Sequence, residues 1–118
     1  MNLFQKYGGA DFWSDFLNVF YTRITSSEIL KHHFEDKNIG HIKNMLIGLL
    51  EVTLVTEGHY PEDSLRDSHK HMGISNAELD EWISIYTRTL DDSGIEEEDK
   101  QTVLNVVGSY RSCIVTKP

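Results

Sequence analysis

The residues best suited to do chemistry lie in one stretch, YPEDSLRDSHKHMGI at residues 60–74. As a helix, this stretch places Leu65, His69 and Met72 on one face at the spacing of a buried stripe, while His71 points away from that face. A neutral imidazole on an apolar face is a common ligand of metal ions, and also of haem iron. His69 is therefore the candidate metal ligand. The alternative is a buried histidine whose ring nitrogens are satisfied by a backbone carbonyl or a hydroxyl.

Length, charge and cysteine content limit what this stretch can belong to. The chain has 118 residues and a net charge of -8, which suits a single domain over residues 1–118 that does not bind nucleic acid. Its one cysteine, Cys113, excludes an internal disulfide and a thiolate metal site. The N-terminus lacks a basic segment followed by an apolar run, and no stretch approaches roughly 18 apolar residues. We therefore expect a cytoplasmic protein without membrane contact.

Apolar residues recur at helical spacing along most of the chain, and both prolines lie outside the strongly periodic segments. The pattern predicts an all-α domain with four long helices and several short ones. A short turn precedes the second long helix, and the short helix with His69 precedes the third. The long helices are expected at about residues 11–25, 38–55, 75–92 and 96–114.

Local signals predict where these helices begin. Gly8 and Gly9 break a short opening turn. Asp11 is expected to cap the first long helix, because its carboxylate can accept a hydrogen bond from a free backbone N–H. Ser75 or Asn76 opens the third long helix in the same way.

Five short segments carry a resemblance to a known family. They are YGG at residues 7–9, FYTRI at 20–24, ILKHHF at 29–34, Tyr60, and LRDSHKHMGI at 65–74. In this order and spacing, over about residues 3–114, the chain resembles the truncated haemoglobins. The type it resembles most is bacterial, cyanobacterial and protozoan, with an N-terminal Gly-Gly motif. The resemblance implies a truncated globin fold, a two-over-two helical sandwich that encloses haem b (iron protoporphyrin IX).

The resemblance assigns roles to individual residues around that haem. His69 falls at the position of the proximal iron ligand, in agreement with its face on the helix. Tyr21 falls on the distal tyrosine whose hydroxyl donates a hydrogen bond to bound oxygen, and Phe34 falls on the phenylalanine that packs against the porphyrin. A donor fixed in a dry pocket stabilises oxygen bound to ferrous iron, because that oxygen carries partial negative charge. Without the resemblance, Tyr21 would be a core aromatic residue with a satisfied hydroxyl.

Further positions are expected to contact the haem. Tyr60 and Arg66 fall where the family can bind the haem propionates, and Lys43 is another candidate for that role. Leu49 and Met72 are expected in the apolar lining, Met72 on the same helix face as His69.

The chain departs from the family pattern on its distal side. Ile42 and Leu46 stand where relatives often carry glutamine, so the second polar partner expected there is missing. Trp82 stands where some subgroups use a tryptophan indole as a distal donor. We therefore expect Tyr21 and Trp82 to form a distal pair in an otherwise apolar pocket. The alternative for Trp82 is simple core filling.

Two residues are candidates for a sixth iron ligand. Met45 stands where some cyanobacterial relatives have a histidine that binds the iron, and a thioether can also ligate haem iron. A methionine at this spacing is also a common core residue. His41, one turn earlier on the same side, is the rival ligand. His32 and His33 are expected near the haem edge or in solvent.

The resemblance implies reversible binding of oxygen, carbon monoxide and nitric oxide. It also implies nitric oxide detoxification by dioxygenation, in which bound oxygen converts nitric oxide to nitrate. That turnover needs a separate reductase as electron donor, because the sequence contains no flavin or nicotinamide module. A haem-based redox or gas sensor is an alternative. So is a function of another class, a helical interaction module that holds no cofactor.

Overall fold

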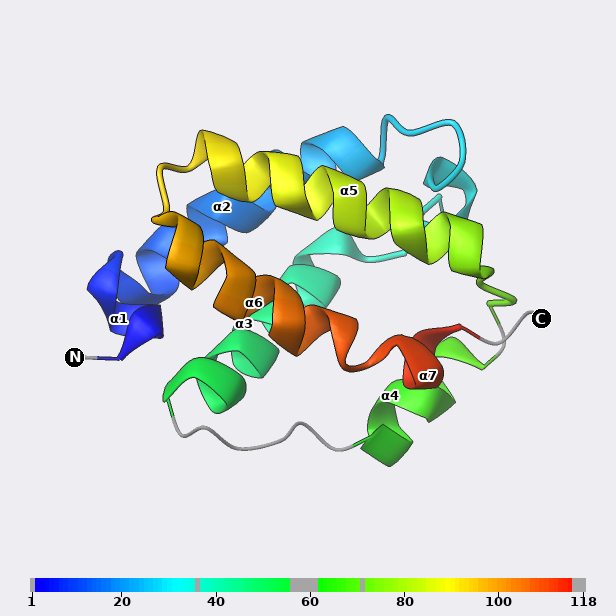
Figure 1. The fold of residues 1–118 in the computed structure, drawn as a ribbon. Helices are drawn as coiled ribbons and strands as arrows, with labels where there is room; N and C mark the ends of the chain where they lie inside the picture. The colour runs from blue at the N-terminus through cyan, green and yellow to red at the C-terminus, as the bar shows by residue number, and fades with distance from the viewer. Residues whose placement is uncertain (1, 36, 56–61, 71, 116–118) are drawn as a thin grey trace.

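A computed structural model describes residues 2–35, 37–55, 62–70 and 72–115 (Figure 1). Every regular element in these ranges is helical, which confirms the predicted all-α class. None of the described helices combines the length and the apolar character needed to traverse a bilayer. The elements are α1 (Leu3–Lys6), α2 (Gly9–Ile24), the 3-10 helix η1 (Lys31–His33), α3 (Ile39–Val55), α4 (Glu62–His69), α5 (Asn76–Asp92), α6 (Glu97–Gly108) and α7 (Arg111–Ile114).

The four long helices form two layers of two. Figure 1 shows α5 and α6 running in opposite directions in front of α2 and α3. Helix α2 packs against both α3 and α5, and α5 packs against α6. The short α1 contacts α2 and α3, while α4 packs on α7 at the other end of the molecule.

An aromatic core joins α2 to α5. Trp13 and Phe20 of α2 are fully buried, and Tyr86 of α5 is 1 % exposed. The Tyr86 ring lies edge-on to Phe16 and Phe20, with ring centroids 5.1 and 4.9 Å apart. The Trp13 indole N–H donates to the Phe4 carbonyl at 3.0 Å, so α1 is fixed to the same core. Aromatic side chains at helical spacing thus supply much of the burial that stabilises these helices.

The start of α2 differs from the prediction. The helix begins at Gly9 with Gly8 as its N-cap, so Asp11 lies in the first turn and not at the cap. Gly8 has a φ of +127°, and an added Cβ there would lie 3.1 Å from the Phe12 Cβ. Glycine therefore permits a sharp entry, with the N-cap three residues earlier than expected. Asp11 then stabilises the helix by placing its charge near the positive end of the helix dipole.

The start of α5 follows the prediction. Ser75 is the N-cap, and its hydroxyl oxygen accepts from the Glu78 backbone N–H at 3.1 Å. The Glu78 carboxylate in turn accepts from the Ser75 backbone N–H at 2.9 Å. This reciprocal capping box satisfies two backbone donors at once and fixes the Glu78 side chain against the helix end.

The last predicted helix is broken into two. Helix α6 ends at Gly108 and α7 begins at Arg111, so the expected continuous helix to residue 114 is wrong. Glycine weakens a helix interior, and the Ser109 hydroxyl donates to the Val106 carbonyl at 2.7 Å, where it competes with the backbone. The break turns Tyr110, which is 2 % exposed, into the interior.

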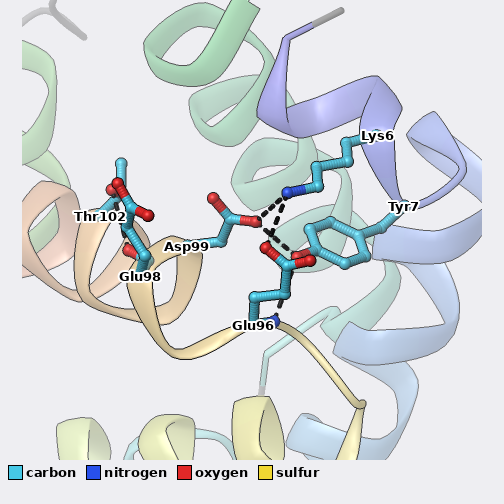
Figure 2. A network of polar contacts seen from close by, with 6 residues as sticks. All are labelled: Lys6, Tyr7, Glu96, Glu98, Asp99 and Thr102. Atoms are coloured by element: carbon cyan, nitrogen blue, oxygen red, sulfur yellow. Dashed lines mark hydrogen bonds and ion pairs between the residues drawn. The ribbon is translucent and has the colours of Figure 1, made fainter.

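A polar network, which we call the Asp99 latch, ties α1 to the start of α6 (Figure 2). It comprises Lys6, Tyr7, Glu96 and Asp99. The Lys6 ammonium donates to Asp99 at 2.7 Å and to Glu96 at 3.1 Å, and the Tyr7 hydroxyl donates to Asp99 at 2.5 Å. Hydrogen bonds from Lys6 and then Tyr7 lower the pKa of Asp99. The latch therefore depends on an ionised Asp99.

Candidate functional site

A cavity of about 400 Å³, which we call the central cavity, lies between α3, α4, α5 and α7. Helix α2 and the turn at η1 also contribute to its wall. Its size falls within the range of about 300–1,000 Å³ typical of small-molecule sites, and most of its lining side chains are apolar.

Most of the predicted site residues come together here. They come from four helices, α2, α3, α4 and α5, and from Phe34 and Met72 just outside helices, so the fold gathers residues that are far apart in sequence. The predicted residues in the lining are Tyr21, Phe34, Ile42, Met45, Leu46, Leu49, His69, Met72 and Trp82.

Two of the described residues that were predicted to contact haem, Lys43 and Arg66, are not part of this wall. The Lys43 ammonium donates to the Asn18 side-chain oxygen. The Arg66 side chain is half exposed and pairs with Asp63 at 3.6 Å. Tyr60 lies outside the described residues.

His69 is the last residue of α4 and is half-buried. Its Nδ1 lies 2.7 Å from the Leu65 carbonyl oxygen, one turn earlier. Because a carbonyl oxygen only accepts, this contact requires the proton on Nδ1 and leaves Nε2 with a free lone pair. No described residue makes a hydrogen bond to that second nitrogen. A backbone carbonyl thus satisfies one ring nitrogen and orients the other for use as a ligand.

Tyr21 brings a hydroxyl to the cavity from α2. The residue is 4 % exposed, and its ring lies edge-on to Phe20 and Phe34. Its hydroxyl makes no hydrogen bond to any residue in the described ranges. Burial, followed by the nearby Tyr86, raises the pKa of Tyr21 well above its usual range. The group therefore stays protonated at physiological pH and is available as a donor.

Trp82 belongs to both the core and the cavity wall. Its ring stacks on Tyr86 with centroids 4.9 Å apart and lies edge-on to Phe20 at the same distance. It also lines the central cavity from α5. Packing alone thus accounts for a tryptophan here, while its position leaves the indole within the cavity wall.

Helix α3 forms the remaining predicted wall. Ile42, Leu46 and Leu49 present apolar surface to the cavity, and no carboxylate or amide side chain of α3 lines it. Met45 also lines the cavity but is 38 % exposed, and His41 is an exposed member of the same wall.

Two polar residues of the wall were not predicted as site residues. His33 of η1 and Glu78 of α5 line the cavity, with the His33 Nε2 lying 2.7 Å from a Glu78 carboxylate oxygen. Lys37 is a further polar member of the lining. The Ser75-x-x-Glu78 spacing of a capping box is a sequence signal that could have drawn attention to Glu78, but it indicates a structural role.

The site residues fit an iron porphyrin better than a bare metal ion. In the part of the chain that the structure describes, His69 belongs to no group of three or more side chains that could share an ion. A porphyrin supplies four of its iron's ligands itself, so one imidazole completes the set. The apolar wall suits the porphyrin faces, and the free Tyr21 hydroxyl offers a donor to a ligand on the iron.

Comparisons with known proteins agree with this geometry. The sequence model of the family described as bacterial-like globin matches residues 2–115. A group 1 truncated hemoglobin of Tetrahymena pyriformis is 24 % identical over 115 residues, which cover 98 % of this chain and 95 % of the relative.

Solved structures agree as well. The Fe(III) form of the truncated hemoglobin from Tetrahymena pyriformis superposes with a TM-score of 0.85 at 22 % identity, covering 99 % of this chain and all of the other. The 2/2 hemoglobin of Synechococcus sp. PCC 7002, in the cyanomet state with covalently attached heme, gives a TM-score of 0.87 at 18 % identity and the same coverage. The predicted two-over-two helical fold is confirmed.

Proposed function

This chain belongs to the bacterial-like globin family, and on that premise we propose that it binds haem b in the central cavity and takes up oxygen, carbon monoxide and nitric oxide reversibly. His69 is the proximal ligand and Tyr21 the distal donor in this proposal. The observation that carries it is the free Nε2 of His69, held at the cavity by the bond from Nδ1 to the Leu65 carbonyl.

Haem would supply an iron that binds a diatomic gas. On the proximal side, the Leu65 carbonyl fixes the tautomer of His69, so the imidazole does not reorganise when it binds. On the distal side, the Tyr21 hydroxyl would donate a hydrogen bond to oxygen held in the cavity, which carries partial negative charge. Carbon monoxide carries less of this charge, so Tyr21 favours oxygen more strongly than carbon monoxide.

The other residues of the cavity wall keep the distal side dry and add a second hydrogen-bond donor. Ile42 and Leu46 of α3 exclude polar groups from the distal side, and a dry site strengthens the one hydrogen bond that Tyr21 donates. We assign Trp82 as a second, weaker donor, because its ring is already held by Phe20 and Tyr86.

Cationic side chains and a tyrosine hydroxyl would hold the haem propionates. We keep Arg66, Lys43 and Tyr60 in this role from the family pattern, and we add Lys37, which lines the cavity. The ion pair of Arg66 with Asp63 spans 3.6 Å at the surface, so it is weak enough to exchange for a propionate.

Absorption spectra of the full chain with hemin test the proximal assignment. A Soret band near roughly 400–430 nm should form with the wild type, in ferric and ferrous states, through axial histidine ligation. The His69→Ala variant should lose this band or bind hemin far more weakly. His32→Ala removes an exposed imidazole outside the cavity wall and serves as the matched control. An unchanged spectrum in His69→Ala would refute the assignment.

Oxygen dissociation rates test the distal assignment. Loss of the hydrogen bond in Tyr21→Phe should speed dissociation roughly 10- to 100-fold, the range for a bond to a charged partner. Trp82→Phe should have a smaller effect. Tyr86→Phe is the control, since Tyr86 lies in the same aromatic core without lining the cavity. Equal rates in Tyr21→Phe and the wild type would contradict the role of Tyr21.

Nitric oxide detoxification is the reaction we propose for this site beyond gas binding. Oxygen bound in the cavity would combine with nitric oxide to give nitrate, and a separate reductase would return the iron to its ferrous state. Nitrate formation that continues over many turnovers when an electron donor is added would support this reaction. A single turnover under the same conditions would favour a carrier or a sensor.

A further inference from the structure

A second group of potential metal ligands lies where η1 meets the start of α5. It consists of His32 and His33 from η1 and Glu78 from the first turn of α5. One ligand atom from each residue lies within 4.8 Å of the other two. None of the three is needed to hold haem iron, so the group requires its own explanation.

Both imidazoles converge on one carboxylate oxygen. The distance to this Glu78 oxygen is 2.7 Å from the His33 Nε2 and 3.4 Å from the His32 Nε2. The two rings lie with centroids 3.9 Å apart and planes tilted by 39°. Consecutive residues of a helix do not normally share a face, so the approach of these two rings goes with their shared contact to the Glu78 carboxylate.

The carboxylate is held in place before any ion binds. One oxygen of Glu78 accepts from the Ser75 backbone N–H, which leaves the other oxygen for the two histidines. Burial opposes ionisation of Glu78, but the hydrogen bonds from Ser75 and His33 outweigh it and lower the pKa of the carboxyl. The Glu78 carboxylate is therefore charged at neutral pH, and the Ser75 backbone N–H fixes its orientation.

Two neutral imidazoles and one carboxylate form a ligand set that zinc binds in proteins, with a fourth position left to water. Ligand atoms around tetrahedral zinc lie roughly 3.4 Å apart, given metal–ligand distances of about 2.0–2.2 Å. The 3.4 Å distance from His32 matches that spacing, whereas the 2.7 Å contact of His33 is a hydrogen bond that would have to lengthen by about 0.7 Å when an ion binds. The His32 side chain is 57 % exposed, so solvent can reach the fourth position.

We propose that His32, His33 and Glu78 bind one divalent transition-metal ion of the zinc class. A simple ion pair between His33 and Glu78 would account for one imidazole but not for the second. His33 and Glu78 line the central cavity, so the ion would join η1 to α5 across its wall. This site is separate from His69 and does not depend on haem.

Zinc chloride titrated into the full chain by calorimetry, with and without hemin, tests the site. One ion per chain should bind in both cases. His32→Ala and Glu78→Gln should each weaken binding by at least about tenfold, since loss of even an outer partner costs that much. Glutamine keeps the oxygen that accepts from Ser75, so Glu78→Gln preserves the capping box.

His41→Ala is the matched control, because it also removes an exposed histidine, and His41 lies outside the group of His32, His33 and Glu78. Its zinc affinity should equal that of the wild type. If Glu78→Gln loses its helical circular dichroism, His32→Ala decides the outcome alone, because His32 is exposed. Absence of stoichiometric binding, or equal affinity in His32→Ala and the wild type, would overturn the proposal.

Discussion

The aromatic core between α2 and α5 is more completely buried than the wall of the central cavity. In the core, Trp13, Phe20 and Ile24 are completely buried and their neighbours are other side chains of this protein. In the wall, Met45 remains 38 % exposed and His69 is half-buried beside a cavity of about 400 Å³.

The difference separates what the chain stabilises alone from what a cofactor completes. Close-packed side chains gain dispersion contacts on every side, whereas those along a cavity lose contacts on one side. We therefore expect the core to hold the fold and the wall to depend on haem. Mutation, hydrogen exchange and acid each test this division.

Trp13→Ala should be the most damaging change. It removes a fully buried indole and its hydrogen bond to the Phe4 carbonyl. The free energy of unfolding should fall by about 3–5 kcal/mol, as measured by urea denaturation followed by circular dichroism. A loss below about 1 kcal/mol would mean that the core does not hold the fold.

Hemin should protect the wall more than the core. At a free hemin concentration about 100 times the dissociation constant, binding adds about 2.7 kcal/mol, or a hundredfold in the opening equilibrium. Amide hydrogen exchange should therefore slow most in α3 and α4 and least in α2. Equal slowing throughout the chain would show that the two regions unfold as one unit.

Acid should remove the contribution of the Asp99 latch. The pKa of Asp99 is lowered in the folded protein, so its stabilisation is fully present above its ordinary value of 3.8 and is lost as the pH falls through the lowered value. The difference in melting temperature between the wild type and Asp99→Asn should be constant from about pH 5 to 8 and shrink below about pH 4. Asp15→Asn, an exposed change on α2, is the control.

Met45→Ala should be the mildest of these changes. The side chain is more than a third exposed, so the free energy of unfolding should change by less than about 0.5 kcal/mol in urea denaturation. The spectrum of the hemin-bound variant also tests iron ligation. A low-spin form that is present in the wild type and persists in Met45→Ala would remove Met45 as a sixth ligand.

Periodicity was enough to predict most of the fold. Trp13, Phe20 and Tyr86 repeat at helical spacing and lie in the core, because burial of one face stabilises a helix. The exact ends of the helices depend on small local effects that periodicity does not show. A glycine with positive φ moves the start of α2 ahead of Asp11, and a serine side chain that competes with the backbone ends α6 before residue 111.

The cavity wall could be predicted only in part. His69 and Leu65 lie one turn apart on a single helix, so their relation follows from spacing. His33 and Glu78 are 45 positions apart, and only packing of η1 on α5 brings them together. No local pattern carries that information. The same holds for Lys43, whose bond to Asn18 joins two different helices.

The Asp99 latch also bears on how fast the native state is lost. Asp99 contacts Tyr7 and Lys6 across 92 and 93 positions, so the contact closes almost the whole chain into a loop. Such closure carries a high entropic cost and is expected only after the folding barrier has been crossed. Weakening it should then speed unfolding and leave the refolding rate nearly unchanged. The first turn of the polypeptide would in this way help to set the lifetime of the folded molecule.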